Sequence, residues 1–354
     1  MGVAVIHRSG SNARQGKVLY FEWLRCLGAA AVVMIHVTSG IMDNYPISEV
    51  GTARALIWSL MQVALLRRAV PVFFMITGAL LLDPSKEIGW SKVWGYVRRM
   101  AIVLFTWGFL FCIMQRLFTE RALTLSLLTG SLLDLLSNKG FSHLWYIYAL
   151  IGAYLLLPML RTWVASADES DQRVMLAILF VFTCVVPTLN AAFGLELSTF
   201  VWVTSSVFYV LLGYYAHGRL ELNGRMLAVG FGSLLVCMLL KTYGIVAVGE
   251  YWKWLHGPAC PFEAIWSLCV FLLAKRWFDR QYAERGIVAR GADLSFGVYV
   301  LHSLFINVLY KVLNWMPWRL PPMVFEATIW SISCMGSVVL IYIARRIPLV
   351  RTIL

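Results

Sequence analysis

The sequence predicts an all-α fold: a polytopic membrane bundle of about ten transmembrane helices with both termini in the cytoplasm. Of its 354 residues, 60% are hydrophobic and only 14% are charged, against roughly a quarter charged in soluble domains. The apolar residues gather in runs of about 20, the length that crosses a bilayer. The net charge of +12 comes from Lys and Arg at the ends of these runs. They form no basic stripe with interleaved aromatics, so we expect no nucleic-acid partner.

Ten apolar runs are the predicted spans, and short connections join them. Residues 1–19 are the predicted cytoplasmic N-terminal tail, 20–346 the transmembrane domain and 347–354 the cytoplasmic C-terminal tail. The first run is too long for a signal-peptide core and lacks a clear cleavage site, so we expect it to remain as an anchor. The spans cover residues 20–41, 56–82, 100–118, 143–160, 174–193, 199–217, 226–246, 259–275, 294–313 and 326–344.

The second span contains two arginines and a proline, Arg67, Arg68 and Pro71. Proline removes a helix hydrogen bond and clashes with the preceding turn, so we expect the span to be broken near Pro71. Membrane proteins tolerate such a break where it lines a cavity. The arginines need an anion, a carboxylate or backbone carbonyls, and phosphate suits the planar fork of arginine. A ligand phosphate and an ion pair with an acidic side chain are both compatible with the pattern.

Orientation follows from the distribution of Lys and Arg. With the N-terminus inside, the cytoplasmic segments hold 20 of them and the opposite side holds 8. Cytoplasmic loops are the positively charged ones, so both termini are expected inside. The acidic loop at Asp168, Glu169 and Asp171 is the weakest link, but acidic residues count little in this rule.

The seven cysteines are scattered and form no CxxC pattern, so they are interpreted as small apolar packing residues and no metal site is predicted. The sequence contains no GxSxG, P-loop, HExxH or dinucleotide fingerprint. No loop is long enough for a soluble domain. Any chemistry is therefore expected in the membrane part.

The first span carries three polar groups on one face: Glu22, Arg25 and His36. The eleven positions from Arg25 to His36 correspond to three helical turns plus about 20°, and to roughly 16 Å along the axis. Arg25 alone is compatible with an interface arginine paired with Glu22, and His36 alone with a buried histidine satisfied by a neighbour. Together on one face inside a bilayer, such groups usually mark a pathway or an active site.

Between these two polar residues the same face carries small or slender side chains, Gly28, Ala29, Val32 and Val33. Small residues allow close packing of a neighbouring helix. They also leave room for a slender chain along the helix, and we expect an open tunnel between Arg25 and His36.

Three further stretches contain candidate ligands. Arg98 and Arg99 precede the third span, where they are either membrane anchors or ligands of a cytoplasmic nucleotide. His143, Trp145 and Tyr146 begin the fourth span, as interface aromatics or as a platform for a sugar ring. Ser295, Tyr299 and His302 share one helix face in the ninth span.

Taken in order, these stretches resemble the acyltransferase-3 family of integral membrane acyltransferases. The resemblance rests on the arginine–ten residues–histidine pattern, followed by "VPVFFMITG", "HLWY" and "SFGVYVLH". It covers nearly the whole chain and is closest to compact bacterial polysaccharide O-acetyltransferases. The chain has Glu22 where the family often has Asp, Cys26 for Gly and Thr77 for Ser. It lacks the RxxR loop motif of some members, for which Arg98 and Arg99 are the nearest substitute.

The resemblance implies an enzyme of the bacterial inner membrane that transfers an acyl group, most often acetyl, from cytoplasmic acetyl-CoA to a glycan hydroxyl. It implies that Arg25 binds the acyl-CoA, assisted by Arg68, Arg98 or Arg99, with the pantetheine arm along Gly28 and Ala29. His36 would be the general base and Glu22 would orient Arg25. The candidates for acceptor contacts or oxyanion stabilisation are His143, Trp145, Tyr146, Tyr299 and His302. Direct transfer and a covalent acyl-histidine both remain open, and other polysaccharide-biosynthesis proteins are expected partners.

A transporter or flippase for a lipid-linked or acidic solute is the alternative. Ten helices, a broken second span and intramembrane His and Arg are compatible with it. The chain shows no repeat symmetry of the transporter kind, and the ordered motifs favour the enzyme. Release of CoA in the presence of a glycan acceptor discriminates the two.

Overall fold

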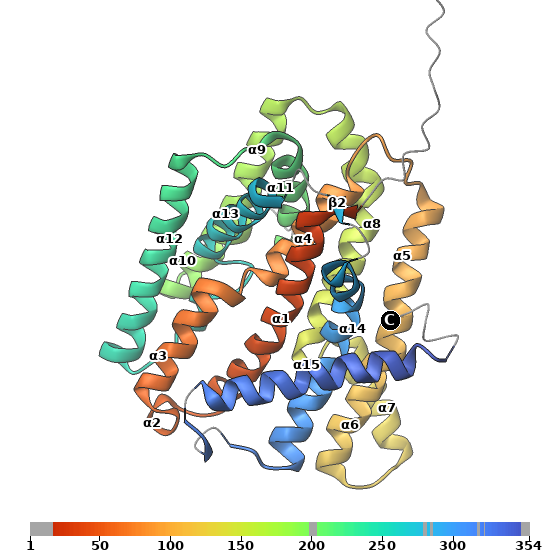
Figure 1. The fold of residues 1–354 in the computed structure, drawn as a ribbon, viewed down its shortest axis with the longest axis vertical. Helices are drawn as coiled ribbons and strands as arrows, with labels where there is room; N and C mark the ends of the chain where they lie inside the picture. Colours follow the sequence, from red (N-terminus) through yellow and green to blue (C-terminus); the bar gives the residue numbers. More distant parts are fainter. Residues whose placement is uncertain are drawn as a thin grey trace, which may run out of the picture.

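The computed structural model describes residues 17–197, 204–278, 282–283, 286–316, 319–321 and 323–347. Within these residues the fold is all-α, as predicted, apart from one short strand pair (Figure 1). Strand β1 (Lys17–Val18) pairs antiparallel with β2 (Tyr282–Ala283). This pair ties the start of the first helix to the segment before α14.

Eight helical segments of the described chain are long and apolar enough to cross a membrane. The chain is therefore a multi-pass membrane protein. They are α1 (Leu19–Met42); Thr52–Leu81, with α3 (Thr52–Met61) and α4 (Ala69–Leu81); Trp90–Glu120, with α5 (Trp90–Val103) and α6 (Phe109–Glu120); α8 (Trp145–Ser166); Glu169–Phe193, with α9 (Glu169–Phe180) and α10 (Val186–Phe193); Gly224–Val248, with α12 (Gly224–Tyr243); Ile287–Val312, with α14 (Ile287–Asn307); and α15 (Val324–Ala344).

The other two predicted spans coincide with shorter or more polar helices. Helix α11 (Ser205–Arg219) has 15 residues, and part of the predicted span 199–217 lies outside the described residues. Helix α13 (Pro261–Phe278) has 18 residues and contains Glu263, Lys275 and Arg276. The sequence count of ten therefore rests on two helices that do not have the length and apolarity of the other eight. Two small helices, α2 (Ile47–Val50) and α7 (Leu125–Leu136), complete the fold.

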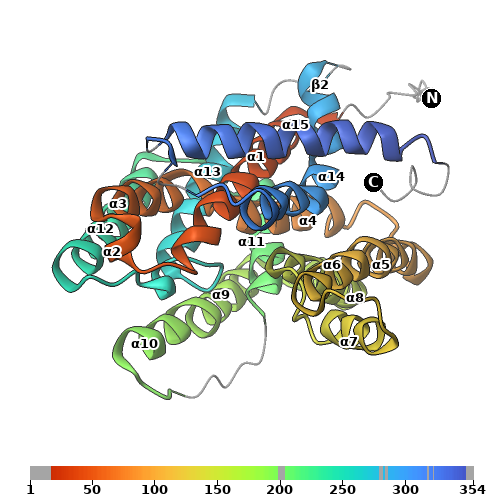
Figure 2. The same ribbon diagram turned by 90° about the horizontal axis from the view of Figure 1, so that it is seen from below.

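Helix α1 lies in the middle of the bundle and packs along α14 and α4 (Figure 1). On its other side, α4 packs along α11, while α15 crosses the bundle and covers α1 and α14 (Figure 2). The two helices that carry the sequence motifs, α1 and α14, are thus neighbours in the core.

Short polar caps explain where several peripheral helices begin. The side chains of Thr124, Asp168 and Asn223 each accept a hydrogen bond from a backbone N–H in the first turn of α7, α9 and α12. Such caps satisfy donors that have no partner inside the helix. Each cap thus helps to fix the residue at which its helix begins.

The break in the second span lies one turn before its predicted position. A π-helical turn covers Gln62–Leu66, and Arg67 and Arg68 form the turn before α4. Pro71 falls in the first turn of α4, where proline is tolerated because the N–H it lacks is not needed. The irregular backbone therefore presents both arginines at one place.

Helices α4 and α11 approach each other so closely that their backbones touch. A β-carbon at Gly78 would collide with the carbonyl of Val210, and one at Gly213 with the carbonyl of Met75. Small residues permit such contacts between membrane helices. Glycine is required at both positions.

Candidate active site

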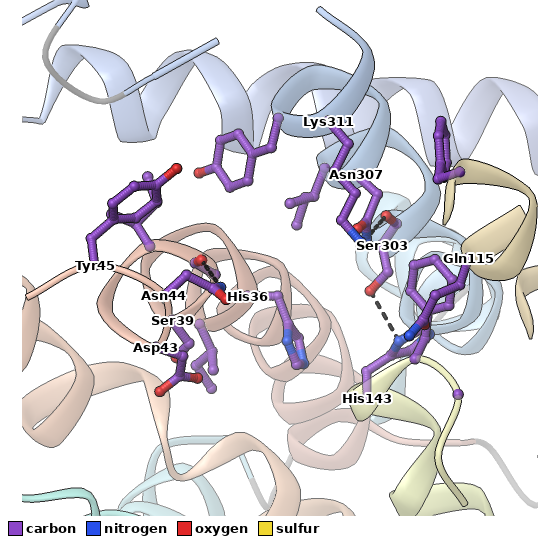
Figure 3. Close-up of a pocket in the computed structure, with 18 of the residues that line it drawn as sticks. His36, Ser39, Asp43, Asn44, Tyr45, Gln115, His143, Ser303, Asn307 and Lys311 are labelled. Atoms are coloured by element: carbon purple, nitrogen blue, oxygen red, sulfur yellow. Dashed lines mark hydrogen bonds between the residues drawn. The ribbon is translucent and has the colours of Figure 1, made fainter. Parts of the chain in front are cut away.

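A cavity of about 1270 Å³ opens at the end of α1 that is remote from Leu19 (Figure 3). The last turns of α1 and the following turn Asp43–Tyr45 form one wall. The end of α14 and residues up to Met316 form another, and α6 with the segment Gly140–Trp145 closes a third side. His36, Arg67 and His143 all line this cavity.

Three histidines from three separate elements meet at the base of the cavity. His36 comes from α1, His143 from the turn before α8, and His302 from α14. The ring centroid of His302 lies 5.1 Å from that of His36 and 5.0 Å from that of His143. The centroids of His36 and His143 are 5.9 Å apart. The structure thus brings together the titratable residues of three of the sequence motifs.

Hydrogen bonds define which nitrogen of each buried histidine carries a hydrogen. His143 Nε2 lies 3.2 Å from the Val300 carbonyl oxygen, and His302 Nδ1 lies 3.1 Å from that of Val298. Carbonyl oxygens only accept, so both nitrogens are N–H donors. In the neutral rings, the remaining nitrogens, Nδ1 of His143 and Nε2 of His302, are acceptors.

The hydroxyl of Ser303 lies between these two accepting nitrogens. Its oxygen is 3.0 Å from His143 Nδ1 and 3.2 Å from His302 Nε2, and it has one hydrogen to donate. One nitrogen is therefore left without a donor while both rings are neutral. A proton on either ring would satisfy all three groups, since that ring would donate to Ser303 and Ser303 to the other ring. The arrangement has a place for one additional proton.

The ring of His36 is differently situated. In the part of the chain that the structure describes, no side chain or backbone group hydrogen-bonds its nitrogens, and the ring faces the cavity (Figure 3). A molecule in the cavity can therefore reach a ring nitrogen directly. Of the three histidines, His36 is the one placed to act on a ligand.

Arg25 and Glu22 form the predicted ion pair near the start of α1. Arg25 Nη1 lies 2.9 Å from Glu22 Oε1. The Glu22 side chain is 2% exposed, whereas that of Arg25 is 33% exposed. Glu22 thus anchors a guanidinium that still reaches the surface.

The face of α1 between Arg25 and His36 is packed. A β-carbon at Gly28 would lie 2.7 Å from the ring carbons of Phe73, and Ala29, Val32 and Val33 are buried. The expected open tunnel is therefore closed by the Phe73 ring, because the small residues have admitted a neighbouring side chain from α4. The cavity reaches His36 from one end and stops short of Gly28.

The two adjacent arginines of the second span have different surroundings. Arg68 is buried and its Nη2 lies 2.9 Å from Glu263 Oε1, so its charge is paired inside the bundle. Arg67 lines the cavity and donates to Gln62 Oε1, at 3.0 and 2.8 Å, and to Ser39 Oγ, at 2.9 Å. Of the two interpretations that the sequence allowed, the structure realises the ion pair for Arg68, and it is Arg67 that faces the cavity.

Arg98 and Arg99 lie on exposed positions of α5. The guanidinium carbon of Arg99 is 5.6 Å from the ring centroid of Phe296 in α14. Both arginines are thus at the surface, a position compatible with binding a nucleotide and with anchoring the helix at the membrane interface.

The aromatic candidates divide into a cavity group and a supporting group. Trp145 lines the cavity beside His143. Tyr299 is buried and its hydroxyl donates to the backbone carbonyl of His143, which leaves this hydroxyl in a positioning role. Tyr146 packs behind, with its ring centroid 5.3 Å from that of Tyr299.

Sequence reasoning overlooked Ser303 and did not select Arg67 or Lys311 as site residues. Ser303 directly follows His302, so a hydroxyl next to an intramembrane histidine was the available signal. For Lys311, which lines the cavity near the end of the α14 segment, the signal was a lone cation in an apolar run.

A family model described as an acyltransferase domain, that of the acyltransferase-3 family, matches residues 18–346. The chain belongs to the acyltransferase-3 family. The three histidines and the cavity lie within the residues that this family model matches. No solved structure matches the chain.

Among curated proteins, this acyltransferase-3 chain is similar to an amino-acid racemase from Enterococcus faecalis. The two are 24% identical over 315 residues, which cover 84% of this chain and 42% of the racemase. The chain thus spans less than half the length of that relative.

Proposed function

We propose that this acyltransferase is an O-acetyltransferase that moves an acetyl group from acetyl-CoA to a hydroxyl of a glycan. The observation that carries the proposal is the position of His36. Its ring faces a large polar cavity, with the proton-accepting group of His302, Ser303 and His143 directly behind it. General-base catalysis needs such a nitrogen within reach of the acceptor proton.

In the proposed step, a nitrogen of His36 removes the proton of the acceptor hydroxyl as its oxygen attacks the thioester carbonyl. The C–O bond forms, the C–S bond breaks, and the CoA thiolate takes up a proton as it leaves. His302 is next to His36, and its hydrogen-bonded partners have a place for one proton. The free acceptor nitrogen of this cluster is a second place for the proton that His36 removes.

The donor is expected at the opposite end of α1. Arg25 is held by Glu22, partly exposed, and lies on the same helix as His36. A guanidinium binds phosphate through charge-assisted hydrogen bonds, and Arg98 and Arg99 are exposed cations that can assist. For the thioester to approach His36, the Phe73 ring must leave its place on Gly28.

We place the protein in the bacterial inner membrane, and the distribution of Lys and Arg supports an orientation in which the donor site faces the cytoplasm. The cavity then opens on the other side, where glycans of the cell surface and the proteins that assemble them are accessible. The acceptor, the acetyl donor and this location are all parts of the proposal.

The substitution His36→Ala tests it. Loss of a general base costs about 10²- to 10⁴-fold in rate, so cells with this variant should lack the acetyl group that the wild-type protein adds to their surface glycans. Mass spectrometry of those glycans, with CoA release from acetyl-CoA in membranes, is the measurement. His217→Gln is the matched control, because His217 bonds Tyr20 at the other end of α1. Unchanged glycan acetylation by His36→Ala would reject the proposal.

A further inference from the structure

The cavity is lined by more positive than negative charge. Its charged lining residues are Arg67, Arg121, Lys253, Lys311 and the single carboxylate Asp43. Lys253 Nζ lies 2.9 Å from Asp43 Oδ1, so this pair neutralises itself. Three cations then remain, and none of them has a carboxylate partner among the residues that the structure describes.

Arg67 is the most informative of these cations, because it lies within a membrane-spanning segment. Its hydrogen bonds go to the neutral side chains of Gln62 and Ser39. These partners hold the guanidinium in place and leave its full charge. An arginine in a membrane segment is costly without a counter-charge, and the neighbouring Arg68 has one in Glu263. Glu263 also interacts with Arg67, but from beyond ion-pair distance, so the guanidinium is still able to meet an anion that enters the cavity.

The position of Arg67 relates this charge to the site of chemistry. Ser39, which accepts a hydrogen bond from Arg67, follows His36 by three residues on α1 (Figure 3). Three residues are close to one helical turn, about 5 Å along the axis. Gln62 is fixed in turn, because Tyr251 donates to its Oε1 and its Nε2 donates to Thr38. A small molecule in the cavity can thus bind Arg67 with one group and present another to His36.

We propose that the acceptor is anionic and that Arg67 binds its carboxylate or phosphate group while His36 acts on a hydroxyl nearby. Lys311 and Arg121 add positive potential at the mouth, which attracts such an acceptor. The role of His36 in this inference rests on the proposed function. The anion site at Arg67 concerns binding alone and does not depend on it. It narrows the acceptor to an acidic or phosphorylated carbohydrate.

The phosphates of acetyl-CoA are the competing source of negative charge. The Phe73–Gly28 contact separates the cavity from the Arg25 end of α1, so we assign the cavity to the acceptor. The experiment includes CoA as an arm for this reason.

Binding is measured with the purified full-length protein in lipid nanodiscs. The sugar probes are D-glucuronate for a carboxylate, D-glucose 6-phosphate for a phosphate and D-glucose as the uncharged analogue, and CoA is the fourth probe. Saturation-transfer NMR gives each affinity at low ionic strength and again at high salt. The variants are Arg67→Gln, Arg67→Lys and the charge-matched control Lys139→Gln, which is exposed and outside the cavity lining.

The Arg67→Gln variant should bind at least one anionic probe about tenfold more weakly than wild type, because a charge-assisted pair is lost. Binding of glucose should be unchanged. Lys139→Gln should behave as wild type, and Arg67→Lys should retain part of the affinity as proof that the site is intact. Whether the carboxylate or the phosphate probe responds identifies the group that the acceptor carries.

Two results would overturn the anion site: wild-type binding that is the same for charged and uncharged probes, or full anion affinity in Arg67→Gln. A loss of CoA affinity in Arg67→Gln without a loss for the sugars would assign the cavity to the donor and also reject the proposal. These experiments measure binding and not turnover. The binding result for Arg67 therefore holds whether or not the acetylation test succeeds.

Discussion

At the scale of single residues, the hydroxyl of Ser303 determines how the two buried histidines share their hydrogens. It is the one group that touches an accepting nitrogen of both His143 and His302 among the described residues. An alanine there would leave two buried nitrogens facing no donor in that part of the chain. A lost buried hydrogen bond of this kind costs about 1–3 kcal/mol.

Ser303→Ala should therefore lower the rate of acetyl transfer about 10- to 100-fold, which is at or below the lower limit of direct acid–base contributions because Ser303 acts through the histidines. The protein should still fold, with a loss of stability of about 1–3 kcal/mol. The rate of CoA release and the thermal midpoint in nanodiscs are the measurements. Ser333→Ala is the control, a buried serine of α15 outside the cavity lining. Equal rates for the two variants would remove Ser303 from the proton-accepting group.

At this scale, the sequence identified the three histidines as candidates but did not predict that they lie next to one another. His36, His143 and His302 are conspicuous because titratable groups are rare in apolar runs. Their contact depends on how α1, α8 and α14 pack, and no local pattern contains that information. The sequence also did not show which of Arg67 and Arg68 faces the cavity. Successive residues of a helix point about 100° apart, and the packing of the surrounding helices determines which of these directions leads to the cavity.

At the scale of helices, the contact between α4 and α11 is the least tolerant of change. Gly78 and Gly213 place each backbone against the other, and α4 also positions Phe73 and follows Arg67. A shift of α4 would therefore move both the ring on Gly28 and the cation in the cavity.

The substitution Gly78→Ala should destabilise the protein by about 3 kcal/mol or more, beyond ordinary overpacking, because the new methyl group meets a rigid carbonyl. We expect poor yield of folded protein by fluorescence-detected size-exclusion chromatography. The control is Gly152→Ala in α8, where a β-carbon meets no atom within 4 Å. A Gly78→Ala protein as stable as this control would show that α4 and α11 can separate at no cost.

The helices themselves could be predicted well because a bilayer requires long apolar segments. The interruptions were harder: the π-helical turns at Gln62–Leu66 and Val308–Val312 leave no signature as clear as a proline. Of the five π-helical turns in the described residues, these two border the cavity, through Arg67 directly after the first and Lys311 within the second. Such turns are frequent at functional sites.

At the scale of the whole molecule, the arrangement places the two expected substrate sites at opposite ends of α1. Orientation in the membrane then decides which substrate comes from which side. The excess of Lys and Arg in the segments predicted to be cytoplasmic is the basis for placing the cavity on the outer side.

Single cysteines test this orientation in intact cells with a membrane-impermeant maleimide. Glu250→Cys, on the cavity side, should be labelled from outside, and Lys92→Cys should be labelled only after permeabilisation. Both positions are exposed. The wild-type protein is the blank, since five of its seven cysteines are buried. The reverse pattern of labelling would invert the assignment and place the cavity in the cytoplasm.

The Phe73 ring on Gly28 has a consequence for the cell that carries this protein. An enzyme that works across a membrane needs a passage between two aqueous phases, and a passage open along its whole length would conduct protons and dissipate the membrane potential. With the ring in this position, α1 and α4 pack against each other between Arg25 and the histidines. For the two-sided enzyme that we propose, this contact would keep the passage closed while no donor is bound, and so prevent a proton leak.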